Sequence, residues 1–171
     1  GLFEVGPQFL EDTEEGQQTV AGILRSASIG GRHWLSGPRN VDLFDVKADC
    51  LSLLEEFGLV AASLSLSAGA PNWYHPGRSG QIKLGPKTVL GYFGELHPNI
   101  LSELELEGQV VGAEVFLSNV PIPRLKKSRV RPVLNSRDLP SVDRDFAFLV
   151  KDDIQVGELL RAVRSVSGKD S

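Results

Sequence analysis

Residues 79–94 read SGQIKLGPKTVLGYFG, and this stretch indicates an antiparallel hairpin. Two runs with apolar and β-branched side chains, 79–84 and 88–94, lie on either side of residues 85–87, which read GPK. A three-residue connection that contains glycine is typical of neighbouring antiparallel strands. The stretch therefore predicts that the fold is built on an antiparallel sheet.

A helix is predicted before the hairpin. Apolar residues recur there at steps of three and four, which places them on one helical face. They are Leu43, Val46, Cys50, Leu53, Leu54 and Phe57. Asp42 suits the N-cap, and Gly58 suits the left-handed position that commonly ends a helix. We expect the apolar face of this helix to pack on the sheet.

Three further strands are expected. Residues 19–26 form a short apolar run, residues 61–67 alternate leucine with serine, and residues 109–117 alternate large apolar residues with others. Pro98 suits the first position of a short helix that runs to about Leu106. Together with the hairpin, these elements predict an α+β fold in which helices flank an antiparallel sheet.

The composition changes after residue 118. Residues 119–140 hold four prolines and little apolar periodicity, which indicates a linker. A strand is expected over 144–150. A helix is expected over 155–165, with an apolar stripe formed by Val156, Leu159, Leu160 and Val163. We therefore divide the chain into a first domain, 1–118, a linker, 119–140, and the start of a second domain, 141–171.

The composition excludes several classes of protein. The 171 residues are 41% hydrophobic and 23% charged, which is typical of a folded globular chain, and the net charge of −4 provides no global attraction to nucleic acid or anionic membranes. No run approaches the roughly 18 apolar residues that span a bilayer. Cys50 is the single cysteine, so a reducing compartment is expected. The chain has no methionine and opens on an apolar stretch, so we expect a piece of a longer protein.

The residue types that carry metal or nucleophilic chemistry are scattered. His33, His75 and His97 show no pair at metal-ligand spacing, so no metal site is expected. Cys50 lies on the apolar face of the predicted helix and is interpreted as a small core residue. The chain has neither a Gly-x-Ser-x-Gly motif nor a phosphate-binding glycine motif. We therefore expect no catalytic residue here.

Two polar positions each allow two interpretations. The first is the segment His75, Pro76, Gly77 and Arg78. It either grips an anion or forms a tight turn in which Arg78 caps a carbonyl or carboxylate, and the turn is favoured. The second is Glu114, in the middle of an apolar strand. It is either half-buried with a base or an arginine as partner, or an outward-facing acid on a half-exposed sheet.

A basic cluster lies in the expected linker and consists of Arg124, Lys126, Lys127, Arg129 and Arg131. Such a local patch on an acidic chain can contact the phosphates of RNA. The same pattern is typical of a solvated linker, or of one that pairs with acidic residues of its own domain. The linker interpretation is favoured slightly.

Three stretches carry a family resemblance. The first is residues 41–49, VDLFDVKAD; the second is residues 75–79, HPGRS, followed by residues 90–98, LGYFGELHP; the third is residues 139–147, LPSVDRDFA. In this order and spacing they resemble the β subunit of bacterial phenylalanyl-tRNA synthetase. The resemblance covers nearly the whole chain, and its combination of stretches is more specific than any one of them.

The resemblance implies a module with the class II aminoacyl-tRNA synthetase fold and no active site of its own, followed by an incomplete ferredoxin-like βα unit that begins the family's anticodon-binding domain. In this family catalysis belongs to the α subunit, and two αβ heterodimers assemble. ATP and magnesium serve the whole complex, so no cofactor is expected within this chain. tRNA is an expected partner of the full complex, a membrane is not, and the expected location is cytoplasmic.

The leading hypothesis is therefore a structural and assembly module of an aminoacyl-tRNA ligase. Two alternatives from other classes remain open. One is an RNA-binding module that acts through the basic cluster. The other is a free-standing small α+β hydrolase that uses His75 and a carboxylate.

Overall fold

The fold is described from a computed structural model, which defines residues 1–14, 16–31, 34–35, 37–122 and 142–166. The chain divides into two compact units, Gly1–Pro123 and Arg124–Ser171. The first unit holds an antiparallel sheet with few helices, so the predicted α+β class is confirmed. Within the described ranges, no helix has the length and apolar character that crossing a membrane requires.

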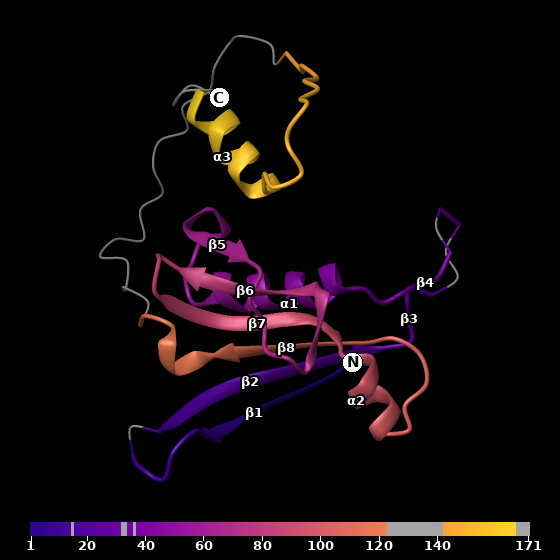
Figure 1. The fold of residues 1–171 in the computed structure, drawn as a ribbon, viewed down its shortest axis with the longest axis vertical. Coiled ribbons are helices and arrows are strands. Elements are labelled where there is room, and N and C mark those ends of the chain that lie inside the picture. Colours follow the sequence, from indigo (N-terminus) through magenta and orange to yellow (C-terminus); the bar gives the residue numbers. More distant parts are fainter. Residues whose placement is uncertain (15, 32–33, 36, 123–141, 167–171) are drawn as a thin grey trace. The chain divides into compact units, whose positions relative to one another are not determined.

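The sheet of the first unit has six strands in the order β1-β2-β8-β7-β6-β5, and all neighbouring pairs are antiparallel (Figure 1). The strands are β1 (Leu2–Phe9), β2 (Gln17–Ser26), β5 (Leu64–Ser67), β6 (Tyr74–Leu84), β7 (Thr88–Leu96) and β8 (Val110–Phe116). β8, the last strand in the sequence, lies between β2 and β7. It therefore joins the N-terminal pair of strands to the other three.

The predicted hairpin is confirmed as β6 and β7. Leu84 pairs with Thr88 across the turn, and Gly85 takes a positive φ of 67° there, a conformation that glycine adopts without steric cost. The register shifts twice along the hairpin, between Ile82 and Lys83 and again between Tyr74 and Ser79. Such shifts bend a strand and re-aim its side chains.

The predicted helix is confirmed as α1 (Leu43–Glu56). Asp42 is its N-cap, and a reciprocal capping box joins Asp42 and Asp45: each side chain accepts a hydrogen bond from the other residue's backbone N–H. This arrangement satisfies N–H groups that the first turn of a helix leaves free. Gly58 follows the helix with a φ of 84°, as predicted.

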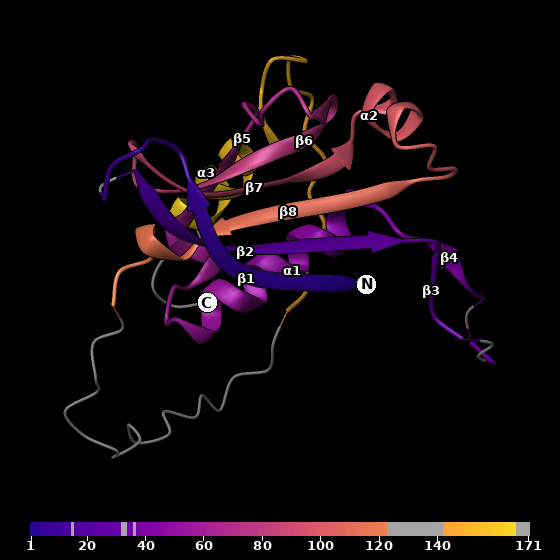
Figure 2. The same ribbon diagram turned by 90° about the horizontal axis from the view of Figure 1, so that it is seen from below.

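α1 covers one face of the sheet (Figure 2). Its buried residues are Val46, Cys50 and Leu54. They pack against side chains from several strands, which include Ala21, Ile82, Leu90, Phe93, Val111, Ala113 and Val115. The β8 residues that join this core, Val111, Ala113 and Val115, alternate along the strand, so one face of β8 meets the helix. The hydrophobic core of the unit is this single layer between α1 and the sheet.

Gly91 allows the close approach of β7 and β8. A Cβ added at this position would collide with the backbone oxygen of Glu114 on the neighbouring strand. The LGYFG segment of β7 thus needs its first glycine for contact between the strands rather than for a turn.

Several local predictions differ from the structure, either because a strand was missed or because the bounds of an element were wrong. β1 was not predicted as a strand, because Gly6 and Pro7 interrupt its pattern and most of its side chains are exposed. The expected strand 61–67 begins with a 3-10 turn, η1 (Ala61–Ser63), and the helix at Pro98, α2 (Pro98–Glu103), stops before Leu106. Two short paired strands, β3 (Ser28–Ile29) and β4 (Arg39–Asn40), were also not predicted. Another 3-10 turn, η2 (Leu117–Asn119), follows β8.

In the described part of the second unit, the predicted strand is absent and the predicted helix is present. The predicted strand over 144–150 is wrong, since residues 142–155 contain no strand. A strand needs a neighbour to pair its backbone groups, and the described part of this unit provides none. The predicted helix is confirmed as α3 (Val156–Val166), and its Val156, Leu160 and Val163 remain exposed.

We expect Leu54→Ala to lower the free energy of unfolding by about 2–5 kcal/mol, because Leu54 is fully buried between α1 and the sheet and the change leaves a cavity. Denaturant unfolding measures the effect. Leu10→Ala is the matched control, since Leu10 is 65% exposed, and it should change the value by less than about 0.5 kcal/mol. Equal effects of the two changes would contradict this account of the core.

Candidate functional site

The basic cluster proposed for RNA phosphates lies outside the described residues. This applies to all its members, Arg124, Lys126, Lys127, Arg129 and Arg131. His33 also lies outside them. The candidate site is therefore built from the polar groups of the first unit.

The segment from His75 to Arg78 lies in the irregular first part of β6 rather than in a separate loop. Nδ1 of His75 accepts a hydrogen bond from the backbone N–H of Gly77 at 3.1 Å, and Oγ of Ser79 donates to the carbonyl of His75 at 2.7 Å. Both bonds are local and hold the bend of the strand. The described contacts of His75 include no carboxylate, so they give the hydrolase alternative no catalytic pair.

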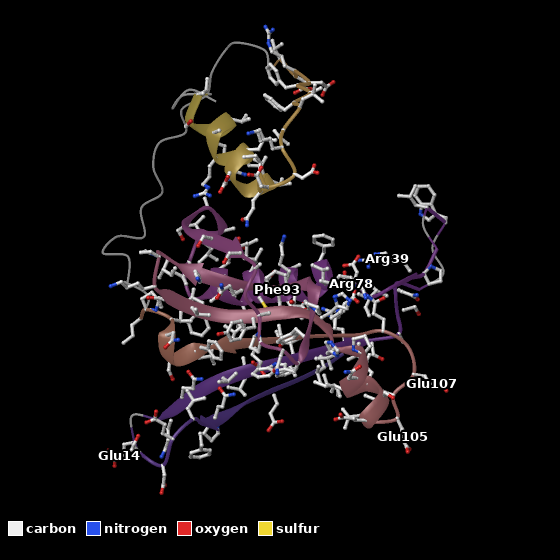
Figure 3. The ribbon with its side chains drawn as sticks, viewed as in Figure 1. Glu14, Arg39, Arg78, Phe93, Glu105 and Glu107 are labelled. Carbon is white, nitrogen blue, oxygen red and sulfur yellow. The ribbon has the colours of Figure 1, made fainter. Side chains whose placement is uncertain are left out.

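Arg78 pairs with a carboxylate, as the turn interpretation expected. Its Nε lies 2.6 Å from Oε2 of Glu95 on β7, and Nε2 of Gln109 donates to Oε1 of the same carboxylate at 2.7 Å. We call Arg78, Glu95 and Gln109 the Arg78 cluster; Arg78 is labelled in Figure 3. A cavity of about 390 Å³ lies beside it, lined also by Pro98 and Leu101 of α2. Because Glu95 balances the charge of Arg78, this arginine does not offer an unpaired positive charge to an anion.

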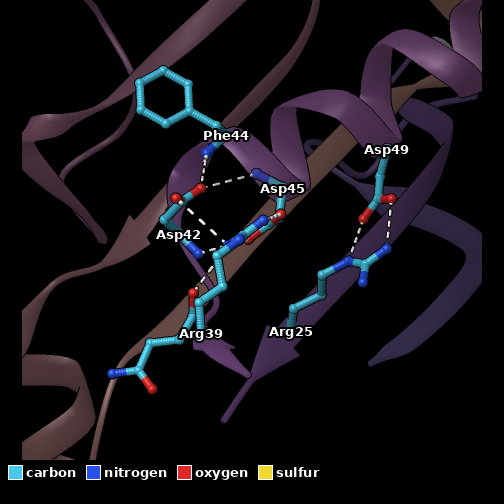
Figure 4. A network of polar contacts seen from close by, with 7 residues as sticks. Arg25, Arg39, Asp42, Phe44, Asp45 and Asp49 are labelled. Atoms are coloured by element: carbon cyan, nitrogen blue, oxygen red, sulfur yellow. Dashed lines mark hydrogen bonds and ion pairs between the residues drawn. The ribbon is translucent and has the colours of Figure 1, made fainter. Parts of the chain in front are cut away.

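A second polar network holds the start of α1 (Figure 4). Nη1 of Arg39, on β4, donates to Oδ2 of Asp45 at 2.8 Å, and Nη2 of the same arginine contacts Oδ1 at 2.5 Å. Asp42 lies 3.7 Å from Arg39 as a weaker partner. The hydrogen bond from Arg39 lowers the pKa of Asp45 to about 2. The network ties the small β3–β4 sheet to the helix.

A third pair joins α1 to the main sheet. Nε of Arg25, on β2, lies 2.5 Å from Oδ2 of Asp49, and Nη2 donates to Oδ1 at 2.7 Å. This bidentate geometry is typical of strong arginine–carboxylate contacts. The hydrogen bond to Asp49 raises the pKa of Arg25. With Arg39, Asp42 and Asp45, this pair forms what we call the α1 anchor.

Glu114 lies on the face of the sheet away from α1, because its neighbours Ala113 and Val115 point into the core. It is half-buried, which raises the pKa of its carboxyl. Glu114 is therefore an acid on the open face of the sheet that is half-buried, which combines parts of the two interpretations. The expected base or arginine partner is not found, since no hydrogen bond or ion pair joins Glu114 to a described residue.

Two other titratable groups, Cys50 and Tyr74, are buried. Cys50 lies in the core, where burial raises the pKa of its thiol to about 12. Tyr74 is also buried, and burial raises the pKa of its phenol. A thiol with so high a pKa is a poor nucleophile, so Cys50 acts as the small core residue that was predicted. No three histidine, cysteine or acidic side chains gather to hold a metal ion in the part of the chain that the structure describes.

Sequence reasoning missed Glu95 as the partner of Arg78. Ser79 pairs with Gly94 across β6 and β7, so one further step along each strand places Arg78 opposite Glu95. Counting back from the pairing of Leu84 with Thr88 would instead place Arg78 opposite Gly94, because the register shifts by one residue between Ile82 and Lys83. The Arg25–Asp49 contact could not be foreseen either, because it depends on where α1 packs on β2.

The chain is similar to known proteins over nearly its whole length. Residues 1–117 match the family model described as the phenylalanyl tRNA synthetase beta chain CLM domain. The phenylalanine–tRNA ligase beta subunit of Rhodospirillum rubrum is 48% identical over 165 residues, which cover 96% of this chain and 20% of the relative. The corresponding subunits of Paramagnetospirillum magneticum and Bartonella henselae are 46% and 44% identical over 96% and 99% of the chain. The chain spans about a fifth of the length of these curated relatives.

Asp45→Asn should destabilise the chain most at neutral pH. The pKa of Asp45 in the folded chain, about 2, lies below its ordinary value of 3.8, so folding favours the ionised carboxylate. Its stabilising contribution is therefore complete above the ordinary value and is lost as the pH falls towards 2. Unfolding curves of wild type and variant, recorded from pH 7 to pH 2, should converge over this window. A difference that stays constant down to pH 2 would contradict the assigned pKa.

Replacement of Glu114 is expected to stabilise the folded chain, in contrast to replacement of Asp45. Because burial raises the pKa of its carboxyl, the folded chain disfavours the ionised form, and Glu114→Gln should raise the thermal midpoint at pH 7. The gain should shrink as the pH falls through the raised pKa, since the wild-type side chain then becomes neutral as well. The control is Glu107→Gln, at an exposed acid between α2 and β8 (Figure 3), which should leave the midpoint unchanged. A lowered midpoint for Glu114→Gln would show that the carboxylate stabilises the fold.

Proposed function

The chain belongs to the phenylalanyl-tRNA synthetase β-chain family, and from this membership we propose that it is a non-catalytic structural and assembly module of phenylalanine–tRNA ligase. In this role it supports the ATP-dependent attachment of phenylalanine to its tRNA, which the complex of α and β subunits performs. The observation that carries the proposal is the family match over residues 1–117, which coincides with almost all of the compact unit Gly1–Pro123.

The proposed domain organisation follows the same family. Residues 1–118 form a module with the class II synthetase fold, residues 119–140 a linker, and residues 141–171 the start of a ferredoxin-like anticodon-binding domain. The six-stranded antiparallel sheet with α1 on one face supports the first assignment. α3, with exposed apolar residues that further strands could cover, supports the last.

We assign catalysis to the α subunit, and this is supported by the described arginines of the first unit, which are engaged within the fold. Each of its three described arginines pairs with a carboxylate: Arg25 with Asp49, Arg39 with Asp45 and Arg78 with Glu95. Adenylate formation needs positive charge placed on the reacting phosphates. In this assignment ATP and magnesium serve the whole complex.

The partner of the module is the α subunit, within an assembly of two α and two β chains in the cytoplasm. β1 supports an assembly role, because it is an edge strand of the sheet and carries Leu2, Phe3, Val5 and Phe9 as exposed apolar side chains. Exposed apolar groups along a free strand edge are typical of a surface that another chain covers. tRNA is bound by the full complex, with the basic cluster at Arg124 and Arg131 as the candidate for phosphate contacts.

The purified chain should bind the α subunit and should show no phenylalanine-dependent exchange of pyrophosphate into ATP. Light scattering after size-exclusion chromatography measures the association. Phe3→Ser should weaken it about tenfold, because an exposed apolar anchor is lost. Leu104→Ser is the matched control, since Leu104 is also exposed but follows α2.

Two outcomes would refute the proposal. The first is pyrophosphate exchange by the chain alone that a single substitution within it abolishes, since the module would then be catalytic. The second is an absence of binding to the α subunit by a chain whose cooperative unfolding shows that it is folded. An equal loss of binding in Phe3→Ser and Leu104→Ser would show that the interface is not specific to β1.

A further inference from the structure

The face of the sheet opposite α1 carries two acidic residues, on β1 and β8, with a glycine of β2 between them. Glu4 on β1 pairs with Gly22 on β2, Gly22 pairs with Glu114 on β8, and Glu114 pairs with Tyr92 on β7. Directly opposed residues on neighbouring strands point to the same face. Two carboxylates therefore flank Gly22, which has no side chain to fill the space between them.

The two acidic residues and Gly22 form part of a hollow with a volume of about 450 Å³. Its apolar side is formed by Leu24, Leu96 and Trp73, and Glu4, Gly22 and Glu114 also line it. An added Cβ at Gly22 would have no neighbour closer than 3.9 Å, so the surface above this glycine is open. The volume falls in the range of roughly 300–1,000 Å³ that is typical of small-molecule sites.

The charges around the hollow have one sign. Its charged lining residues, Glu4 and Glu114, are both acids. Glu114 is half-buried, and no described residue gives it a hydrogen bond or an ion pair. Burial without a partner raises the pKa of this carboxyl, which indicates that a cation beside it would relieve an unfavourable charge.

We propose that this hollow binds a small organic cation, with an ammonium group against the carboxylate of Glu114 and an apolar body against Leu24, Leu96 and Trp73. The ammonium group complements the unpaired charge, and the apolar residues bury the rest of the ligand. Leu2 and Phe3 of β1 also line the hollow, so the site borders the edge proposed for assembly, but binding of the cation does not depend on the assembly role.

The geometry disfavours a metal ion as the occupant. Glu4 and Glu114 lie two strands apart, so their Cα atoms are separated by about 10 Å at ordinary strand spacing. Calcium and magnesium need about six oxygen ligands around one point. A single ammonium group on one carboxylate needs no such convergence.

Benzylamine is the probe, and the test uses the whole chain. Isothermal titration calorimetry should detect binding, and NMR should show shifts at the amides of Gly22 and Gly112. Glu114→Gln should weaken binding by about tenfold, because a hydrogen bond to a charged group is lost. Benzyl alcohol and benzoate, which keep the ring but remove or reverse the charge, should bind at least about tenfold more weakly. Glu107→Gln should bind benzylamine as the wild type does.

A second variant tests the hollow itself. Gly22→Val leaves Glu114 in place and fills the open space above β2, so it should also abolish binding while the chain still unfolds cooperatively. The proposal is overturned if benzylamine causes no shifts, if Glu114→Gln binds it unchanged, or if benzyl alcohol binds equally well. It is also overturned if only lysine-rich peptides bind, because the face would then be a protein-docking surface.

Discussion

α1 and the sheet depend on one another for their burial. The helix is amphipathic, and its buried residues Val46, Cys50 and Leu54 pack on the apolar face made by β2, β6, β7 and β8. That face in turn needs β8 in the centre of the sheet, between two strands that lie far from it in the sequence. The core therefore forms in one step or not at all, since neither layer buries its apolar side alone.

Apolar packing does not by itself fix where a helix begins or how it is rotated, because the hydrophobic effect has no direction. The α1 anchor provides that direction. Asp42 and Asp45 set the first turn, Arg39 ties it to β4, and the Arg25–Asp49 pair fixes the middle of the helix against β2. These contacts use the described arginines near α1 for structure, so the fold leaves their charge unavailable to a ligand.

The sequence predicted the elements whose signals are local. The periodicity of α1, its Asp42 cap and the Gly85 turn each depend on residues close in the chain, and all three are confirmed. Long-range pairing was harder to foresee. β1 is a strand because β2 lies beside it, despite Gly6 and Pro7, while residues 144–150 have strand-like composition but no described partner and form no strand. For the same reason the Arg25–Asp49 pair could not be predicted, and the Arg78–Glu95 pair depends on a register shift that counting from the turn does not reveal.

A sheet covered by a helix on one face only presents its other face and its free edge to the surroundings. Here the edge strand β1 exposes apolar side chains, and the open face carries an unpaired, half-buried acid at Glu114. The described arginines of the unit are neutralised within it, so neither surface is a cationic platform for phosphates. Because apolar edges favour protein contacts and isolated acids favour cations, the surfaces of this unit suit an assembly module better than a nucleotide site. Contact with phosphates, in the proposed role, then has to come from the basic cluster or from the partner subunit.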